Sequence, residues 1–234
     1  MYIHKIAIVL RNFLKYIKRG GVTNVSLQKV DINNILAGKS IVITGGSDGL
    51  GLVMAQAFLD AGAEVLITGR HLDKLESVCR SLNSNRLHCA EWDVTDFSVI
   101  QMKLDSILSK MERMDVFINN AAFMSNGDWY NDMRIFDKTI DTNLKSVLYI
   151  SQAVAEYYVK QQICGKIINI SSLNAVQGST SPYYISKWGV NCITEGLAKK
   201  YIGQHVVVNG IAPGFLPTGI NKANANANAY TNAL

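Results

Sequence analysis

From residue 39 onward, short runs of β-branched and other apolar residues alternate with longer stretches whose apolar positions recur at helical spacing. This alternation is typical of βαβ units, in which parallel strands are joined by right-handed helical crossovers. We therefore predict an α/β fold with a doubly wound parallel sheet. The predicted strands are residues 40–44, 64–68, 86–91, 115–119, 166–171 and 205–209, and the predicted helices are residues 49–62, 72–82, 96–112, 132–160 and 182–203.

Two segments fall outside this alternation and divide the chain into residues 1–38, 39–220 and 221–234. In the first part, apolar residues recur at helical spacing opposite basic ones, which predicts a basic amphipathic helix. The last part is rich in Asn and Ala and has little apolar bulk to bury. We expect it to be a mobile tail, and residues 39–220 to form the α/β domain.

The formal net charge of +5 comes from residues 1–20, which hold five basic residues and no acidic one. Residues 21–234 hold 18 residues of each sign and no visible basic face, which argues against a nucleic-acid partner. An apolar stripe flanked by five cations instead predicts that residues 1–20 make a peripheral contact with anionic lipid or with a protein groove. Packing of the stripe on its own domain is the alternative.

The 234 residues are 48% hydrophobic, which is enough to form one soluble globular domain. The four cysteines lie far apart without metal-ligand spacing, so we expect reduced, mostly buried thiols and no metal site. No apolar run reaches the ~18 residues of a transmembrane helix, and the N-terminal run does not resemble a cleaved signal peptide. These features predict a cytoplasmic protein.

A glycine-rich sequence, Thr-Gly-Gly-Ser-Asp-Gly-Leu-Gly at residues 44–51, lies between the first predicted strand and the next helix. Glycine permits the sharp turn and lets the backbone approach a pyrophosphate, toward which the helix N-terminus points its amides. A purely structural turn is the alternative. The residues expected to bind a dinucleotide here are Gly45, Ser47, Asp48, Gly49, Leu50 and Gly51.

Four landmarks resemble those of the short-chain dehydrogenase/reductase family. They are TGxxxGxG at residues 44–51, Asn119-Asn120-Ala121, Tyr183-xxx-Lys187 and Pro213-Gly214, and they occur in the family's order. The resemblance implies a Rossmann fold and an enzyme that moves hydride between a nicotinamide dinucleotide and a small-molecule carbonyl or secondary alcohol. It also implies cofactor contacts from Asp93, Val94, Asn120, Ala121, Tyr183, Lys187, Pro213, Gly214 and Thr218.

The resemblance implies that Tyr183 and Lys187 are catalytic. At positions i and i+4 their side chains share one helix face, so the ammonium can lower the pKa of the phenol. The family also uses a serine that polarises the substrate carbonyl. Ser172 lies 11 residues before Tyr183, a shorter spacing than the family's, and Ser171 lies 12 before it. We predict Ser172 and keep Ser171 as the alternative.

Asn143 matches the asparagine that family members use to hold a water in a proton relay, and an asparagine inside a helix is otherwise mildly unfavourable. Ala122 stands where the family usually has glycine, and its Cβ could narrow the cofactor groove. Asp93 could equally cap the turn before Thr95.

After the second predicted strand, Gly69-Arg70-His71 offers a guanidinium and no acid. NAD-preferring relatives usually carry an acid there for the ribose hydroxyls, whereas a guanidinium suits a 2′-phosphate. We therefore expect NADP(H) in preference to NAD(H). An exposed loop arginine without this role is the alternative.

A second hypothesis is a catalytically weak nucleotide-binding protein that acts through partner or membrane contacts. The short spacing between Ser172 and Tyr183, Ala122 and the unusual tail favour it. A sugar-nucleotide epimerase is disfavoured by the glycine spacing.

The chain ends 20 residues after Gly214, which leaves too few for the family's last helix and seventh strand. We expect a truncated product, or a sixth strand whose edge is covered by the N-terminal segment or another subunit. The helices that carry Asn143 and Tyr183 stay available for a homodimer or homotetramer.

Overall fold

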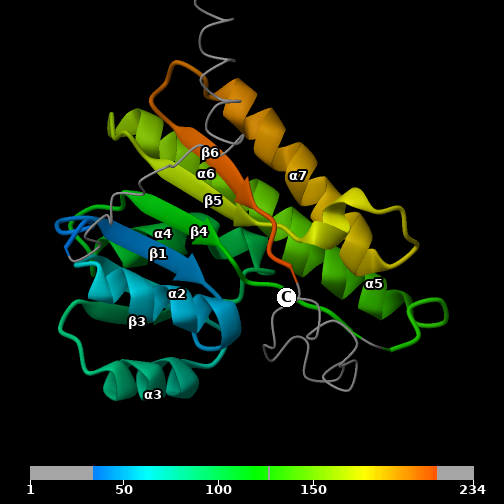
Figure 1. Ribbon diagram of the computed structural model, residues 1–234, viewed down its shortest axis with the longest axis horizontal. Coiled ribbons are helices and arrows are strands. Elements are labelled where there is room, and N and C mark those ends of the chain that lie inside the picture. Colours follow the sequence, from blue (N-terminus) through cyan, green and yellow to red (C-terminus); the bar gives the residue numbers. More distant parts are fainter. Residues whose placement is uncertain (1–33, 126, 215–234) are drawn as a thin grey trace, which may run out of the picture. The chain divides into compact units, whose positions relative to one another are not determined.

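The computed structural model describes residues 34–125 and 127–214. Its six described strands form one parallel sheet in the order β3-β2-β1-β4-β5-β6 (Figure 1). The chain runs outward from β1 to β3 and then returns to place β4 beside β1, which confirms the predicted doubly wound sheet. The strands are β1 (Ser40–Thr44), β2 (Glu64–Gly69), β3 (Leu87–Glu91), β4 (Val116–Asn119), β5 (Lys166–Ile170) and β6 (Val207–Ile211).

Helices cover both faces of the sheet (Figure 1). One face is covered by α2 (Gly49–Asp60) and α3 (Leu72–Leu82). The other is covered by α4 (Ile100–Leu108), α6 (Ser146–Lys160) and α7 (Pro182–Lys200). The short helix α5 (Met133–Ile140) precedes α6.

The residues of β1 show why the strands are continuous apolar runs. Ile41 and Ile43 belong to the core on the side of α2 and α3, while Val42 belongs to the core on the opposite side. All three are at most 2% exposed. Because successive side chains of a strand point to opposite faces, a strand that is covered on both faces needs apolar residues at every position.

Two of the predicted helices are interrupted. The predicted helix 132–160 consists of α5, a π-helical turn η2 (Asp141–Lys145) and α6. The predicted helix 96–112 begins with a 3-10 turn, Phe97–Val99, and its α-helical part ends at Leu108. The chain stays helical at both interruptions. The spacing of its apolar residues therefore did not show where the type of helix changes.

Strand β6 begins at Val207, two residues later than predicted. His205 has a φ of 60°, in the left-handed region that a strand does not use. The expectation of mostly buried cysteines is wrong, because Cys164 and Cys192 are exposed while Cys79 and Cys89 are half-buried.

Several predictions fall on residues outside the described ranges: the amphipathic helix and its contacts at residues 1–20, the tail at 221–234, and Thr218. In the described part of the chain, β6 pairs with β5 alone. None of the described helices combines the length and the apolar character needed to cross a membrane. The described residues also contain no group of His, Cys, Asp or Glu side chains arranged to hold a metal ion.

Candidate active site

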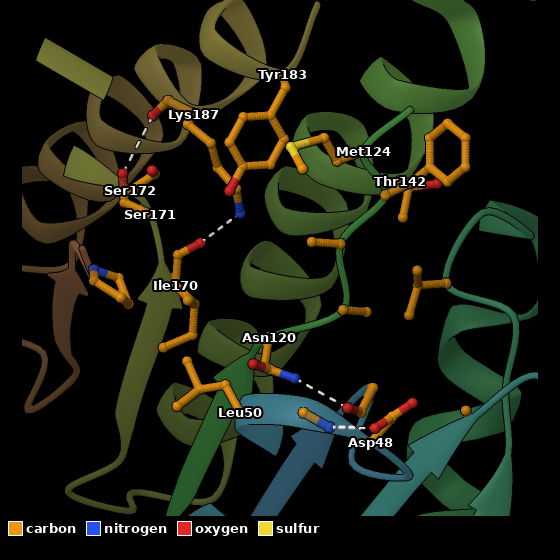
Figure 2. Close-up of a pocket in the computed structure, with 18 of the residues that line it drawn as sticks. Asp48, Leu50, Asn120, Met124, Thr142, Ile170, Ser171, Ser172, Tyr183 and Lys187 are labelled. Atoms are coloured by element: carbon orange, nitrogen blue, oxygen red, sulfur yellow. Dashed lines mark hydrogen bonds between the residues drawn. The ribbon is translucent and has the colours of Figure 1, made fainter. Parts of the chain in front are cut away.

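A cavity of about 970 Å³ lies at the carboxyl ends of the parallel strands (Figure 2). It spans the point between β1 and β4 where the strand order changes direction, which is where open α/β sheets bind ligands. Its volume is near the upper end of the ~300–1,000 Å³ usual for ligand pockets. The sequence-predicted residues that line it are Gly45, Ser47, Asp48, Gly49, Leu50, Arg70, Asp93, Val94, Asn120, Ala121, Ser172, Tyr183, Lys187, Pro213 and Gly214.

The glycine turn after β1 needs its glycines for two reasons. Gly45 and Gly49 have φ values of 67° and 52°, in the left-handed region that favours glycine. A Cβ on Gly51 would overlap the carbonyl oxygen of Gly45, so Gly51 lies behind the turn and is not part of the cavity wall. Asp48 caps α2 by accepting the Gly49 N–H on Oδ1 at 2.7 Å. The turn thus brings its backbone close to the cavity.

Asn120 fastens this turn to the end of β4. Its Nδ2 donates to the carbonyl oxygen of Thr44 at 2.9 Å and to that of Gly45 at 3.0 Å. One dashed line leaves the Asn120 amide nitrogen in Figure 2. The Thr44 hydroxyl accepts the N–H groups of Asn120 and Ala121 at 3.0 Å each. Ala121 and Ala122 follow along the cavity wall. Two loops that are far apart in the sequence are therefore held at a fixed separation.

Charged side chains lie at the end of the cavity nearest β2. Arg70 follows β2, and Lys74 lies in the first turn of α3, where its Nζ is 3.0 Å from Asp48 Oδ2. Both partners of this ion pair are about half exposed, so the pair contributes at most ~1 kcal/mol. Lys74 is not among the cavity residues predicted from the sequence. The helix dipole disfavours a cation in the first turn of a helix. The unfavourable position of Lys74 is the signal in the sequence that could have identified it.

Asp93 lies at the cavity wall and also stabilises a local turn. It lines the cavity after β3, and its Oδ1 accepts the Thr95 N–H at 3.0 Å and the Thr95 hydroxyl at 2.7 Å. The carboxylate is thereby fixed in a local turn at the cavity wall. Val94 lies between Asp93 and Thr95 in the sequence. Its side chain is buried in the core and anchors the turn there.

At the other end of the cavity, Tyr183, Ser172 and Lys187 come together (Figure 2). The Ser172 hydroxyl lies near the Tyr183 phenol and acts to lower its pKa. Lys187 is 2% exposed, its Nζ donates to the Ile170 carbonyl at 2.7 Å, and the same Nζ lies 5.8 Å from the centre of the Tyr183 ring. The end of β5 and the first turns of α7 thus join a phenol, a hydroxyl and a buried amine.

The two adjacent serines differ in their contacts. Ser171 donates its hydroxyl to Asn191 Oδ1 at 2.6 Å, which ties it to α7. Ser172 caps the 3-10 turn Leu173–Val176 by accepting the Asn174 N–H at 3.1 Å. Of the two serines, Ser172 is the one that acts on the pKa of the Tyr183 phenol.

Burial dominates the acid-base properties of this cluster. It raises the pKa of Tyr183 above its ordinary value, and the Ser172 hydroxyl acts in the opposite direction. It lowers the pKa of Lys187 to about 8. The pKa of the phenol is therefore raised and not lowered as expected, because desolvation is the largest cause and Lys187 is not among the groups that shift it.

Asn143 lies in η2 and is fully buried. Its Oδ1 accepts the Phe123 N–H at 2.6 Å, and its Nδ2 donates to the Phe123 carbonyl at 2.8 Å and to the Ser186 hydroxyl at 3.2 Å. The side chain thus clamps the loop after β4 to α7.

Beyond Tyr183 the cavity wall changes character, because its side chains are uncharged. Figure 2 shows Met124 and Thr142 at the end that holds Tyr183, away from Asp48 and Leu50. No motif in the sequence marks this wall, since its loops follow no fixed pattern. Its residues are Phe123, Met124, Thr142, Leu173, Asn174, Gln177 and Tyr184.

The chain and its fold both match known proteins. A family model described as short chain dehydrogenase matches residues 39–229. The 3-oxoacyl-[acyl-carrier-protein] reductase FabG of Chlamydia pneumoniae is 32% identical over 199 residues, which cover 80% of this chain and 77% of that protein. The 5-keto-D-gluconate 5-reductase of Escherichia coli (strain K12) is 30% identical over 84% of this chain and 79% of that protein.

Among solved structures, a gluconate 5-dehydrogenase from Burkholderia cenocepacia in complex with NADP and tartrate superimposes with a TM-score of 0.77 at 26% identity. The match covers 86% of this chain and 80% of that structure.

The low pKa of Lys187 predicts a pH-dependent stability. Because the folded pKa of about 8 lies below the ordinary 10.5, the unfolded chain binds more protons between these values, and stability rises with pH there. In urea unfolding from pH 7 to 10, the stability gained by Lys187→Met over the wild type should shrink as the pH rises, by up to ~1.4 kcal/mol per unit. Parallel pH profiles of the two proteins would show that the folded lysine keeps an ordinary pKa.

Proposed function

Because the chain belongs to the short-chain dehydrogenase family, and is thus an oxidoreductase, we propose that it uses NADP(H) to interconvert a carbonyl and a secondary alcohol. The observation that carries the proposal is the cluster of Tyr183, Ser172 and Lys187 at one end of a cavity whose other end holds Arg70 and Lys74. The relatives' names give two different substrates, a 3-oxoacyl-carrier protein and a keto-gluconate, so they indicate a carbonyl and not one compound.

The cavity fits a dinucleotide. The glycine turn offers close backbone approach and the positive end of α2 to a pyrophosphate, while Asp93 and Val94 would border the adenine. Asn120 and Ala121 would border the nicotinamide half, as would Pro213 and Gly214. When bound, the nicotinamide supplies or accepts the hydride.

Tyr183 would act as the general acid in carbonyl reduction. The substrate oxygen would lie between Tyr183 and Ser172 and accept a hydrogen bond from each hydroxyl. As hydride forms the new C–H bond, the phenol proton passes to the oxygen, and in alcohol oxidation it returns. The raised pKa of Tyr183 keeps the phenol protonated at neutral pH, which suits the reducing direction.

Lys187 and Asn143 would support this proton transfer by Tyr183. The Lys187 Nζ, held by the Ile170 carbonyl, lies where it can donate to a ribose hydroxyl and assist reprotonation of Tyr183. Asn143 would position the wall through its hydrogen bonds with Phe123, and its part in a proton relay stays a prediction.

Arg70 and Lys74 support the choice of NADP(H). They place two cations at the cavity end nearest β2, where they would receive the 2′-phosphate. A 2′-phosphate would attract Lys74 away from the weak surface pair with Asp48. The NADP in the Burkholderia cenocepacia neighbour is consistent with this assignment.

The alternative of a catalytically weak binding protein, favoured by the short spacing, Ala122 and the tail, stays a hypothesis. The grouping of Ser172, Tyr183 and Lys187 at one cavity supports the enzyme. Members of the family act on small molecules and are commonly oligomeric. A homodimer or homotetramer, a peripheral contact through residues 1–20 and a cytoplasmic location stay predictions.

Tyr183→Phe should lower turnover by ~10² or more, because it removes the proton donor. The dissociation constant for NADPH should change by no more than a few fold, since the phenol contributes little to holding the dinucleotide. Tyr149→Phe, at an exposed position on α6, is the matched control. Steady-state rates and fluorescence titration measure the two effects. A Tyr183→Phe enzyme that kept more than about a tenth of the wild-type rate would remove Tyr183 from the proposal.

Arg70→Ala should weaken NADPH binding by the ~1.5–3 kcal/mol of a charge-assisted contact and leave NADH binding nearly unchanged. Arg80→Ala is the control, because it removes the same charge from the far end of α3. Titration of each variant with both cofactors measures the difference. Equal losses for NADPH and NADH would show that Arg70 does not contact a phosphate.

A further inference from the structure

The charges along the cavity wall are segregated. Among the described residues that line it, the Asp, Lys and Arg side chains are Asp48, Arg70, Lys74 and Asp93 at the dinucleotide end, and Lys187 beside Tyr183. Lys187 is already bound to the Ile170 carbonyl and buried. Beyond Tyr183, no described lining residue carries a charge.

The far wall is built from apolar groups with a few neutral polar ones. Phe123, Met124 and Leu173 supply apolar surface, and Leu173 is 56% exposed although it is a large apolar side chain. The amides of Asn174 and Gln177 supply neutral polar groups. Such a wall can desolvate apolar groups and hydrogen-bond neutral ones.

One further cation, Lys138, lies beside a residue of this wall. Its Nζ lies 4.5 Å from the centre of the Phe123 ring, and Lys138 is not part of the cavity wall. A cation on an aromatic face is stabilised by the ring, so drawing it toward a substrate would forfeit that contact.

We propose that the substrate end selects an uncharged ketone, or the corresponding secondary alcohol, with apolar groups near the reacting carbon, and discriminates against substrates with a carboxylate there. This inference rests on the proposed function. A carboxylate placed against this wall would lose its hydration without gaining a cationic partner, and an unpaired buried charge is costly. Its neutral amide isostere avoids that cost.

The test compares ketones that differ in one charge. With NADPH, kcat/KM is measured for 4-acetylbenzamide and 4-acetylbenzoate, and for the aliphatic pair 5-oxohexanamide and 5-oxohexanoate. The amide of a pair should be preferred by about tenfold or more, which corresponds to ~1.4 kcal/mol. Leu173→Arg should shift the amide-to-acid ratio toward the acid by about the same factor, because it places a cation in the wall. Leu173→Gln introduces a polar but uncharged side chain at the same position. It should leave the amide-to-acid ratio within a few fold of the wild-type ratio.

The outcomes separate this inference from the proposed function. Acids reduced as well as their amides would overturn the inference while leaving the oxidoreductase proposal intact. A selective loss of acid turnover in Lys138→Gln would also overturn it, because that lysine would then be a substrate partner. No reduction of any of the four ketones, with NADPH bound, would overturn the proposed function and the inference with it.

Discussion

The junction of β1 and β4 is the constraint on which the rest of the site depends. Connections from these neighbouring strands leave toward opposite faces of the sheet, so the space beyond their carboxyl ends stays open. Thr44 and Asn120 hold that opening at a fixed width through hydrogen bonds that join the glycine turn to the loop after β4. On the other side of the opening, Asn143 forms hydrogen bonds with Phe123 in the loop after β4 and thereby holds this loop near α7. Loops at both ends of the cavity are thus fixed to one rigid sheet.

The distribution of charge along this cavity explains how one site can serve two different ligands. Cations at the β2 end suit the phosphates of a dinucleotide. A buried, partly deprotonable lysine and a protonated phenol lie in the middle, where a proton must move. A neutral wall follows, where a small carbonyl compound would lose its water. Each zone uses residues from a different loop.

The sequence was sufficient for the fold because β1 and its neighbours are buried on both faces, which leaves continuous apolar runs that are easy to recognise. The glycine turn and the Tyr183–Lys187 pair could also be found, since backbone sterics and helix geometry constrain their spacing. The sequence could not decide between Ser171 and Ser172, because that choice depends on a 3-10 turn and on the contact of Ser171 with Asn191.

Other features depend on contacts between distant parts of the chain. The clamp from Asn143 joins η2 to Phe123, 20 residues earlier, and no local pattern announces it. The pKa of Tyr183 moved opposite to the expectation because desolvation is set by the tertiary structure around it and not by the i, i+4 lysine. Lys74 was detectable only as a cation against the dipole of α3.

The most direct test of this account is a fluorescence titration of the unmodified protein with NADPH and, separately, with NADH. If the cavity is a dinucleotide site whose β2 end receives a 2′-phosphate, NADPH should bind at least about tenfold more tightly, a difference of ~1.4 kcal/mol. That preference should fall as salt is added, because the contact is between charges at a partly exposed site. Equal affinity for the two cofactors would contradict the roles given to Arg70 and Lys74, and failure to bind either would contradict the assignment of the whole cavity.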